Sequence, residues 1–261
     1  MKRLLILDCS ALFHRAFNAM KRATGGMTTS AGIPVTGTYG VLNSLFSVLE
    51  KTEYDSIVPC AEGGSNWRKK ESSEYKGNRE SRDIEFYADM SILLEEALPA
   101  LGMTVCKQPG FEADDVIGTL AKQAEKKGFE TYMMTPDKDF GQLVSDHIFI
   151  YKPGRSGNPS EILGPKEVCE KFEVKNPLQV IDILGLWGDA VDNIPGVPGV
   201  GEKTAKKLIS SYGSIENLIK NTHDLKGKLR ENVENYAEQA ILSKQLATII
   251  LDCPVEFDES A

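Results

Sequence analysis

The sequence predicts an α/β protein, with a central, mostly parallel sheet flanked by helices and a helical region towards the C-terminal end. Up to about residue 163, short apolar runs alternate with amphipathic segments, as in the strand–helix units of parallel sheets. Residues 152–163 are rich in Gly, Pro and Ser. From Lys166 onwards the apolar residues keep helical spacing only. We therefore expect two parts, residues 1–163 and 164–261.

The first expected strand, Leu4 to Leu7, is continuously apolar, which is typical of a strand buried on both faces. Further strands are predicted at residues 55–62, 103–106, 130–135 and 147–151, although Pro59 weakens the second. Residues 24–40 are predicted to form a loop. Helical spacing predicts helices over residues 39–49, 83–100 and 113–124.

Composition limits the possible functions. The 261 residues are 41% hydrophobic, enough for a sizeable core, and carry a net charge of −8. An acidic chain argues against a nucleic-acid partner, unless many acids cluster on metal ions. No apolar run is long enough to span a membrane, and Asp8 ends the first apolar segment too early for a signal peptide. The five cysteines include no CxxC pair, which favours reduced thiols in a cytosolic protein over disulfides or zinc.

Carboxylates gather where predicted strands end and helices begin. Five of them occupy two such junctions: Glu112, Asp114, Asp115, Asp137 and Asp139. Acids in a first helical turn gain roughly 0.3–1 kcal/mol each from the helix dipole, but that does not explain three acids in four positions. Asp8 and Glu62 follow two other strands, where open α/β sheets place their ligands. Turn or capping roles remain the alternative for Asp8. We expect these junctions to form half of a divalent-metal site.

Two stretches have the character of phosphate-binding segments. Residues 66–82 interleave aromatic and basic side chains, a pattern that fits either a segment tracking a phosphate backbone or a solvated face. Arg15 could face the same cleft or be an ordinary surface residue. Further on, Asp189 and Asp192 can share one helical face. The Gly/Pro-dense segment 194–205 then leads into a helix carrying Lys203, Lys206 and Lys207, and its backbone could bind phosphate or a monovalent cation.

Six motifs in order resemble the flap endonuclease, or 5′-nuclease, superfamily, including the 5′→3′ exonuclease domain of bacterial DNA polymerase I and stand-alone bacterial and phage 5′ nucleases. The resemblance covers residues 3 to about 250. The motifs are Asp8 after a buried strand, Tyr75–Arg79, Gly110–Asp115, Asp137–Asp139, Gly188–Asn193 and Pro195–Gly201.

This resemblance implies a PIN-like α/β core with a helical arch at about 66–100. It also implies two divalent cations, normally Mg²⁺ with Mn²⁺ as a substitute, that supply a nucleophile and stabilise the leaving oxygen. Lys76 and Arg79 would contact the scissile phosphate. The implied metal ligands, direct or through water, are Asp8, Glu62, Glu112, Asp114, Asp115, Asp137, Asp139, Asp189 and Asp192.

The resemblance further implies a helix–hairpin–helix-type element at residues 194–206 that grips duplex DNA, often with a bound K⁺. The implied DNA-binding residues are Arg15, Tyr39, Arg68, Tyr75, Gly196, Val197, Gly199, Gly201, Lys203, Thr204 and Lys206. The expected substrate is DNA with a 5′ flap, nick or free 5′ end, recognised without sequence specificity. A cytoplasmic monomer acting in DNA replication or repair of a bacterial or phage-infected cell is expected. His14, His147 and His223 are expected to be structural.

One position departs from the family pattern. Relatives usually carry an aspartate seven residues before the arginine at Arg68, and this chain has Ala61 there. We favour Glu62 as its replacement. If neither residue serves, the chain is a weakened or non-catalytic DNA-binding member of the fold. A PIN-type ribonuclease is a further alternative, whereas a Mg²⁺-dependent phosphatase would need an Asp-x-Asp turn that Asp8-Cys9-Ser10 lacks.

Overall fold

The computed structural model describes residues 1–64, 66–79, 81–154 and 159–259. Its centre is a five-stranded sheet of β1 (Lys2–Asp8), β2 (Ser56–Cys60), β3 (Phe129–Met134), β4 (Ile148–Lys152) and β5 (Glu161–Leu163). The strand order is β2-β1-β3-β4-β5. The first four strands run parallel, and β5 pairs antiparallel with β4. The prediction of a mostly parallel sheet is confirmed.

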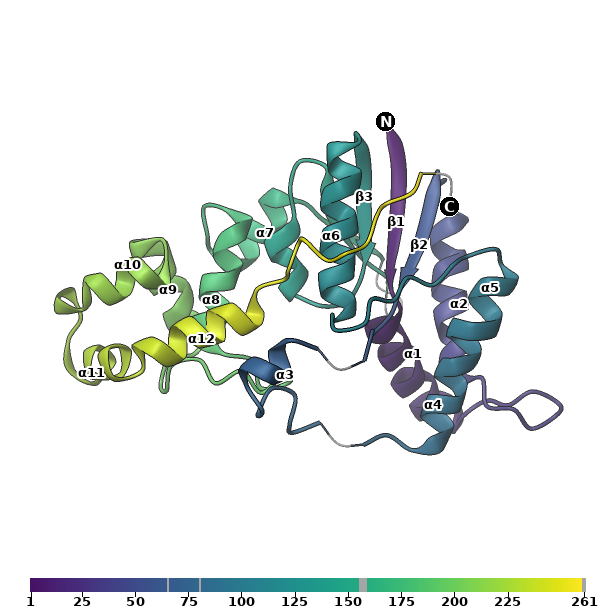
Figure 1. Cartoon of the computed structure of the whole chain (residues 1–261), viewed down its shortest axis with the longest axis horizontal. Helices are drawn as coiled ribbons and strands as arrows, with labels where there is room; N and C mark the ends of the chain where they lie inside the picture. Colours follow the sequence, from purple (N-terminus) through teal and green to yellow (C-terminus); the bar gives the residue numbers. More distant parts are fainter. Residues whose placement is uncertain (65, 80, 155–158, 260–261) are drawn as a thin grey trace.

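Helices cover both faces of the sheet (Figure 1). One face carries α1 (Cys9–Thr24), α2 (Thr36–Leu49) and α4 (Ile84–Ser91); α4 continues through the π-helical turn η1 (Ile92–Ala97) into α5 (Leu98–Ala100). The other face carries α6 (Ala113–Lys126). Successive residues of a strand point to opposite faces, so Leu5 and Leu7 pack with α1 and α2 while Leu4 and Ile6 pack with α6. The sheet is thus buried on both sides.

The remaining helices follow the sheet and extend away from it (Figure 1). They are α7 (Pro165–Phe172), α8 (Val180–Trp187), α9 (Glu202–Tyr212), α10 (Ile215–Lys220), α11 (Gly227–Asn235) and α12 (Ala237–Ala247), with short 3₁₀ turns η2 (Asp139–Leu143), η3 (Pro177–Gln179) and η4 (Thr222–Asp224). One apolar cluster runs from α6 into these helices, joining Val116 to Ile183, Leu208 and Leu246. The boundary at residues 163 and 164 stays a prediction.

After α12 the chain returns across α6 towards the sheet (Figure 1). The Thr119 hydroxyl accepts a hydrogen bond from the Cys253 amide at 3.2 Å, and Gln123 accepts one from the Phe257 amide at 2.8 Å. Phe257 is buried. The C-terminal segment therefore covers the outer face of α6.

The expected strand at residues 103–106 is wrong, because only Cys106 makes a bridge, to Cys60. The Ala61 amide donates to the Cys106 carbonyl at 3.0 Å, and the Cys106 amide donates to the Pro59 carbonyl at 2.8 Å. The next bond of a parallel ladder would need an N–H at Pro59, and proline has none. Pro59 therefore ends the pairing after one step.

Two further differences concern the connecting segments. The Gly/Pro/Ser-rich connector contains β5, which the sequence does not predict. Residues 155–158 of the connector lie outside the described residues. Of the arch expected at 66–100, the described residues before α4 begins at Ile84 contain one helix, α3 (Arg68–Glu71). Residues 73–78 form turns, and Lys76 has a positive φ of 54°. Among the described residues no helix is long and apolar enough to cross a membrane.

Candidate functional site

The candidate site lies at the carboxyl edge of the sheet, where β1 and β3 end. Asp8 closes β1 and caps α1 by accepting a hydrogen bond from the Ala11 amide at 3.0 Å. Its second oxygen accepts a bond from the Thr135 hydroxyl at 2.7 Å. Burial raises the pKa of Asp8 to about 6, and Asp137 adds to the rise. Thr135, for which the sequence predicts no role, thus holds the carboxylate of Asp8 in place.

The second acid, Glu112, is the N-cap of α6 and is only 2% exposed. Its carboxylate accepts hydrogen bonds from four side chains, all from residues 66–76. They are Asn66 at 2.8 Å, Arg68 at 3.1 Å, Tyr75 at 2.9 Å and Lys76 at 2.6 Å. Two of these donors are cationic, so the buried charge is neutralised where it lies.

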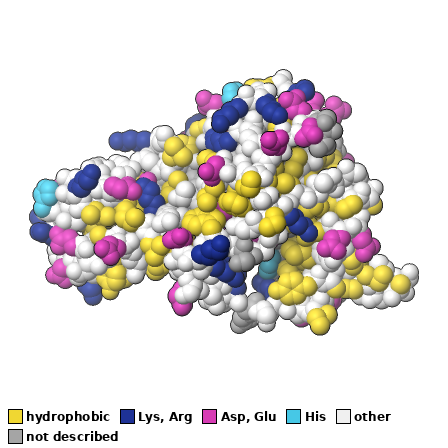
Figure 2. Space-filling view, viewed as in Figure 1, with side chains coloured by type: hydrophobic (Ala, Val, Ile, Leu, Met, Phe, Trp, Pro, Cys, Tyr) yellow, Lys and Arg dark blue, Asp and Glu magenta, His cyan; other side chains and the backbone are white. Residues whose placement is uncertain are grey.

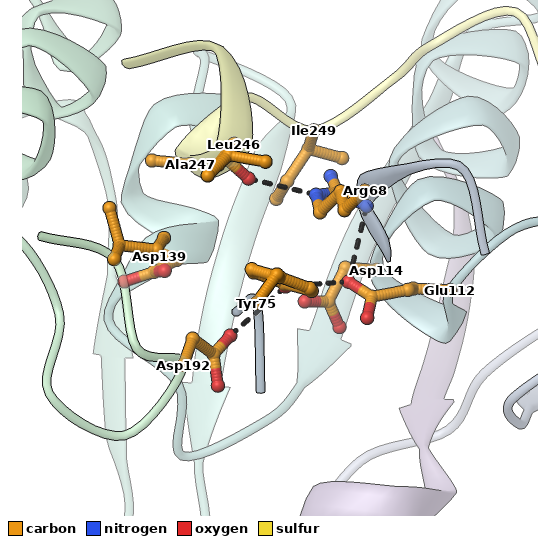
Figure 3. Close-up of a pocket in the computed structure, with 10 residues that line it drawn as sticks. Arg68, Tyr75, Glu112, Asp114, Asp139, Asp192, Leu246, Ala247 and Ile249 are labelled. Carbon is orange, nitrogen blue, oxygen red and sulfur yellow. Dashed lines mark hydrogen bonds and ion pairs between the residues drawn. The ribbon is translucent and has the colours of Figure 1, made fainter. Parts of the chain in front are cut away.

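Asp114 lies beside Glu112 in the first turn of α6 (Figure 3). Burial raises its pKa well above the ordinary value, and the charges of Asp8 and Asp137 raise it further. Asp8 and Asp137 lie 106 and 23 residues from Asp114 in the sequence, yet both act on it in the fold, since a like charge nearby disfavours ionisation.

Asp137 and Asp139 face this group from the end of β3. The Asp137 amide donates to the Thr135 hydroxyl at 3.1 Å, and the Asp137 carboxylate accepts from the Asp139 amide at 2.9 Å. Burial raises the pKa of both carboxyls, with Asp192 acting on Asp137 and Asp137 acting on Asp139. One oxygen of Asp139, Oδ1, is buried with no hydrogen-bond partner.

Asp189 and Asp192 approach from the segment after α8, so both parts of the chain contribute to the site. Lys138 donates a short hydrogen bond to Asp189 and lies 5.3 Å from the centre of the Trp187 ring. Asp192 accepts from Arg79 at 2.5 Å and from the Tyr75 hydroxyl at 3.2 Å. Figure 3 shows Tyr75 between Glu112 and Asp192, joining the two sides.

Residues 74–79, which we call the strap, lie across the acids. The Lys76 ammonium is 2.6 Å from Glu112 and 3.7 Å from Asp192. The Lys76 amide donates to the Asp192 carbonyl at 2.8 Å, and Asn78 donates to the Ala190 carbonyl at 2.7 Å. Burial alone would lower the pKa of Lys76, but Glu112 and Asp192 raise it. The strap therefore supplies cations to the acidic site.

The acids fit divalent cations held partly through water. Every candidate donor is a carboxylate oxygen, the ligand that Mg²⁺ prefers. Asp139 Oδ1 has no hydrogen-bond partner, and its ion-pair distance to the Lys138 ammonium is 3.7 Å. Across the described ranges, no three His, Cys, Asp or Glu side chains are arranged as a ready-made direct site. Mg²⁺ keeps several of its waters in protein sites, so indirect ligation is compatible with this spacing.

Glu62 lies on the same side as Glu112. Its Oε2 accepts a hydrogen bond from the Ala113 amide at 3.4 Å, and although the residue is exposed, its pKa is raised to about 7 by loss of water around the carboxyl and by Glu112 and Asp8. Ala61 is 1% exposed and packs in the apolar cluster of α1 and α2. The chain thus has a carboxylate beside the acids at position 62 and an apolar side chain at 61.

Three predicted site residues are buried in structural roles. Arg68, 2% exposed, pairs with Glu112 and Asp115; its expected DNA contact stays a prediction. Asp115 is 0% exposed and accepts hydrogen bonds from Arg68, Trp67 and the Ile250 amide, which occupy both of its oxygens. Its role as a metal ligand stays a prediction. Tyr75 is 2% exposed, and its DNA contact stays a prediction.

Arg68 also binds the end of α12, a segment for which the sequence predicts no functional feature. Its Nε and Nη2 atoms donate to the carbonyls of Leu246 at 2.8 Å and Thr248 at 2.7 Å. The end of α12 is thereby fixed to the N-terminus of α6. No sequence pattern marks a carbonyl as an arginine partner, so this contact could not be predicted.

The predicted glycine hairpin is present and tightly packed. Gly196 has φ 61°, and a Cβ there would lie 2.5 Å from the Gly188 nitrogen. The Gly196 amide donates to Ser243 at 3.0 Å and the Val197 amide to the Leu186 carbonyl at 2.8 Å. Both amides are thus engaged within the protein, and Val197 is buried. Their direct DNA contact stays a prediction.

The start of α9 remains as the candidate phosphate site. Gly201 and Lys203 are exposed and Thr204 is partly exposed, and the first amides of a helix have no partner within it. Gly199 is exposed as well. Lys206 donates to the Lys171 carbonyl at 2.8 Å and pairs with Glu202 at 2.8 Å. The Lys206 ammonium is thus engaged within the protein, and its DNA contact stays a prediction.

Two predicted residues lie outside this centre. Arg15 donates to the carbonyls of Pro153 at 2.9 Å and Gly154 at 3.3 Å. Tyr39 is 45% exposed on α2. Their DNA contacts stay predictions. Figure 2 shows basic side chains gathered over α3, where Lys69 and Lys70 are exposed, next to acidic ones.

Comparisons with known proteins agree with this geometry. A sequence model for the 5′-3′ exonuclease N-terminal resolvase-like domain matches residues 3–173, and one for the 5′-3′ exonuclease C-terminal SAM fold matches residues 175–261. The chain is 37% identical to DNA polymerase I of Bacillus subtilis over 261 residues and 38% identical to that of Thermus aquaticus over 256 residues. The two matches cover 99% and 98% of this chain, and the chain spans only 29% of the length of each polymerase.

Solved structures show the same fold. The T5 D15 protein co-crystallised with metal ions matches 94% of this chain and 89% of its own, with a TM-score of 0.75 at 19% identity. The catalytic core of Rad2 in complex with a DNA substrate matches 98% and 84%, with a TM-score of 0.59 at 14% identity. With both sequence models matched in order along the chain, the protein belongs to the 5′-3′ exonuclease family.

Proposed function

We propose that this chain is a Mg²⁺-dependent, structure-specific 5′ nuclease that hydrolyses phosphodiester bonds near the 5′ end of branched or nicked DNA. One observation carries the proposal. Carboxylates from β1, α6, the end of β3 and the segment after α8 surround one site, and the cationic strap crosses it. The family membership agrees with it, whereas the substrate, the metal and the biological context remain proposals.

The acids divide into two groups that would hold two divalent cations, with Mn²⁺ able to replace Mg²⁺. Asp8, Glu62, Glu112 and Asp114 lie on the α6 side, and Asp137, Asp139, Asp189 and Asp192 on the other. When bound, such a pair would supply an activated water and stabilise the charge on the leaving oxygen. The divalent ions, zinc, bound to T5 5′-exonuclease support the use of divalent cations at this site.

The strap would bind and orient the phosphate. Lys76 and Arg79 are donors that now neutralise Glu112 and Asp192. A phosphodiester among divalent cations would offer both side chains a competing anionic partner, since charge-assisted bonds to phosphate are strong. Donors held near the scissile group stabilise the charge that develops on its oxygens. Tyr75 would have to leave its buried position before it could reach DNA.

The helical region would hold the duplex. The exposed N-terminus of α9 with Lys203 and Thr204 suits backbone phosphate, which is read without sequence specificity. The hairpin at 194–201 is a candidate K⁺ site. A cytoplasmic monomer acting in DNA replication or repair is the context we propose.

The test is the Asp137→Asn/Asp139→Asn variant, assayed with Mg²⁺ on 5′-flap DNA, nicked duplex, single-stranded DNA and an RNA–DNA hybrid. Asp146→Asn is the matched control, because Asp146 is an exposed aspartate before β4. We expect the double variant to lose cleavage and the control to retain it. Undiminished flap cleavage by the double variant would rule the metal site out, and preference for the hybrid would favour a ribonuclease.

Ala61 favours a second candidate, a weakened or non-catalytic DNA-binding member of the family. Position 61 offers no carboxylate and its side chain is buried. If that candidate is right, the unchanged protein binds 5′-flap DNA tightly but cleaves it no faster than the double variant does.

A further inference from the structure

The chain contains two cysteines held against each other at the rim of the candidate site. Cys60 ends β2, and Cys106 forms the single bridge to it. Backbone bonds of 3.0 and 2.8 Å hold residues 59–61 to Cys106. Partners in neighbouring strands are about 4.8 Å apart, within the roughly 4.4–6.8 Å that separates the Cα atoms of a disulfide. Both side chains belong to the apolar cluster on the α6 face of the sheet, so the two thiols lie on the same side.

The flanking chain keeps the pair in place. Gly63 packs so closely on the segment after Cys106 that a Cβ there would lie 1.8 Å from the Gln108 carbonyl oxygen. The Asn66 and Gly110 backbones form a further bridge. Two contacts beyond the cysteines therefore fix the two segments to each other, which preorganises the thiols.

The two thiols differ in ways that suit a nucleophile and a resolving partner. Cys60 is 0% exposed, whereas Cys106 is partly exposed. A hydrogen bond from the Cys60 thiol lowers the pKa of Cys106 to about 7, although burial opposes it. Burial raises the pKa of Cys169 and Cys253. Thiolate character and access control cysteine oxidation, and Cys106 combines them.

We propose that Cys60 and Cys106 are a thiol pair that hydrogen peroxide or an alkyl hydroperoxide oxidises to an intramolecular disulfide. The Cys106 thiolate attacks the terminal peroxide oxygen and the O–O bond breaks. Cys106 becomes a sulfenic acid, and hydroxide leaves from hydrogen peroxide or alkoxide from an alkyl hydroperoxide. The Cys60 sulfur then attacks the Cys106 sulfur, the S–O bond breaks, and the Cys60 proton leaves with the hydroxyl group as water. Two thiols and one hydrogen peroxide thus give one disulfide and two waters.

The site adjoins the candidate active site without belonging to it. Cys60 is the register partner of Asp8 and precedes Ala61 and Glu62. The chemistry needs no nuclease activity, so the proposal stands apart from the proposed function and is tested without DNA or metal.

The experiment treats the folded 261-residue protein with stoichiometric hydrogen peroxide, then blocks free thiols with N-ethylmaleimide and maps the digested peptides by mass spectrometry. We expect a peptide joining Cys60 to Cys106, two fewer free thiols among the five, and full recovery with dithiothreitol. Circular dichroism before and after treatment confirms that the thiols react in the folded state. Separate alkylation of Cys60 and Cys106 after treatment would overturn the proposal.

Two variants sharpen the result. Cys60→Ser should trap Cys106 as a sulfenic acid that dimedone labels, whereas Cys106→Ser should yield neither the label nor the crosslink. Cys169→Ser is the matched control, because Cys169 is also partly exposed but has no cysteine bridge partner, and it should form the crosslink normally. If Cys60→Ser does not fold, Cys106→Ser carries the test. Faster oxidation of Cys169 than of Cys106 would contradict the assignment.

Discussion

Arg68 and Asp115 form a two-pronged ion pair inside the protein. Nη1 of Arg68 lies 2.8 Å from Oδ2 of Asp115, and Nη2 lies 2.8 Å from Oδ1. Both side chains are almost fully buried, at 2% and 0% exposure. Because Arg68 also donates to Glu112 and to the carbonyls of Leu246 and Thr248, this pair connects the candidate site to the end of α12.

Removing the arginine should destabilise the fold strongly. Arg68→Met would leave the Asp115 carboxylate buried without its partner, which typically costs roughly 3–5 kcal/mol. Urea unfolding of the metal-free protein measures the change. Lys69→Met, at an exposed position next in sequence, should change stability by less than about 0.5 kcal/mol. Equal free energies of unfolding for the two variants would show that the Arg68–Asp115 pair makes no net contribution to stability.

This pair also marks a limit of sequence-based prediction. The acids at residues 112–115 were predicted as one metal-binding group, because alternation of strands and helices fixed only their place at a helix start. Which of them faces the site depends on side-chain direction, and Asp115 points to Arg68 instead. The same uncertainty applies to Tyr75, whose aromatic ring fits DNA stacking and burial equally well.

Local patterns nevertheless predicted most of the architecture. Four of the five expected strands are present, since continuous apolar runs such as Leu4 to Leu7 have few alternatives. The expected strand at 103–106 is absent. Predicting its absence would have required knowing that it lies beside β2, where the missing N–H of Pro59 limits pairing. β5 is three residues long and antiparallel, and such a short edge strand has no distinct sequence pattern.

The helix N-terminus at α9 should contribute to DNA affinity through charge. Lys203 is exposed in its first turn, and each phosphate contact adds about one to the dependence of log affinity on log salt concentration. Lys203→Ala should lower that slope by about one. Fluorescence anisotropy with a flap substrate in EDTA, at several KCl concentrations, measures it. Lys220→Ala, at the exposed end of α10, should leave the slope unchanged.

His14 should make the protein less stable in mild acid. Burial, with Arg82 and Arg79 nearby, lowers its pKa to about 4 from 6.5. As pH falls from 6.5 towards 4, the unfolded chain therefore binds a proton that folded His14 does not, and the free energy of unfolding decreases. Comparing urea unfolding of the wild type and His14→Gln should show the wild type losing more stability over that window. The exposed His223→Gln is the control, and an identical loss in His14→Gln would contradict this.

Lys76 should affect metal binding and catalysis in opposite directions. Its ammonium lies 2.6 Å from Glu112 and 3.7 Å from Asp192, so Lys76→Met removes a positive charge from the acids. We expect divalent-metal affinity without DNA to rise by about tenfold, or ~1.4 kcal/mol. Turnover on flap DNA should fall by about 10²–10³ if Lys76 stabilises the developing charge.

Calorimetric titration with Mn²⁺ and single-turnover cleavage measure the two effects of Lys76→Met. Lys70→Met, an exposed lysine on α3, should change neither. A fall in both quantities would mean that Lys76 helps to build the metal site rather than competing for it.

Positions 61 and 62 decide whether the site has its full set of acids. Glu62 lies near Glu112 and Asp8 and accepts from the Ala113 amide, which suits a replacement ligand. Glu62→Gln should then reduce metal affinity or cleavage by about 10–100-fold, the typical loss for groups that support a metal site. Glu71→Gln, at an exposed glutamate of α3, should have no effect.

The reverse change is Ala61→Asp, which places a carboxylate directly after Cys60, where β2 ends beside Asp8. If Glu62 already serves, the added acid should bring little gain in cleavage. If Glu62→Gln is silent while Ala61→Asp raises both metal affinity and cleavage, the ligand is missing from this chain and Glu62 does not replace it. Because Ala61 is buried in an apolar cluster, urea unfolding of Ala61→Asp must accompany the assay to separate a folding defect from a catalytic one.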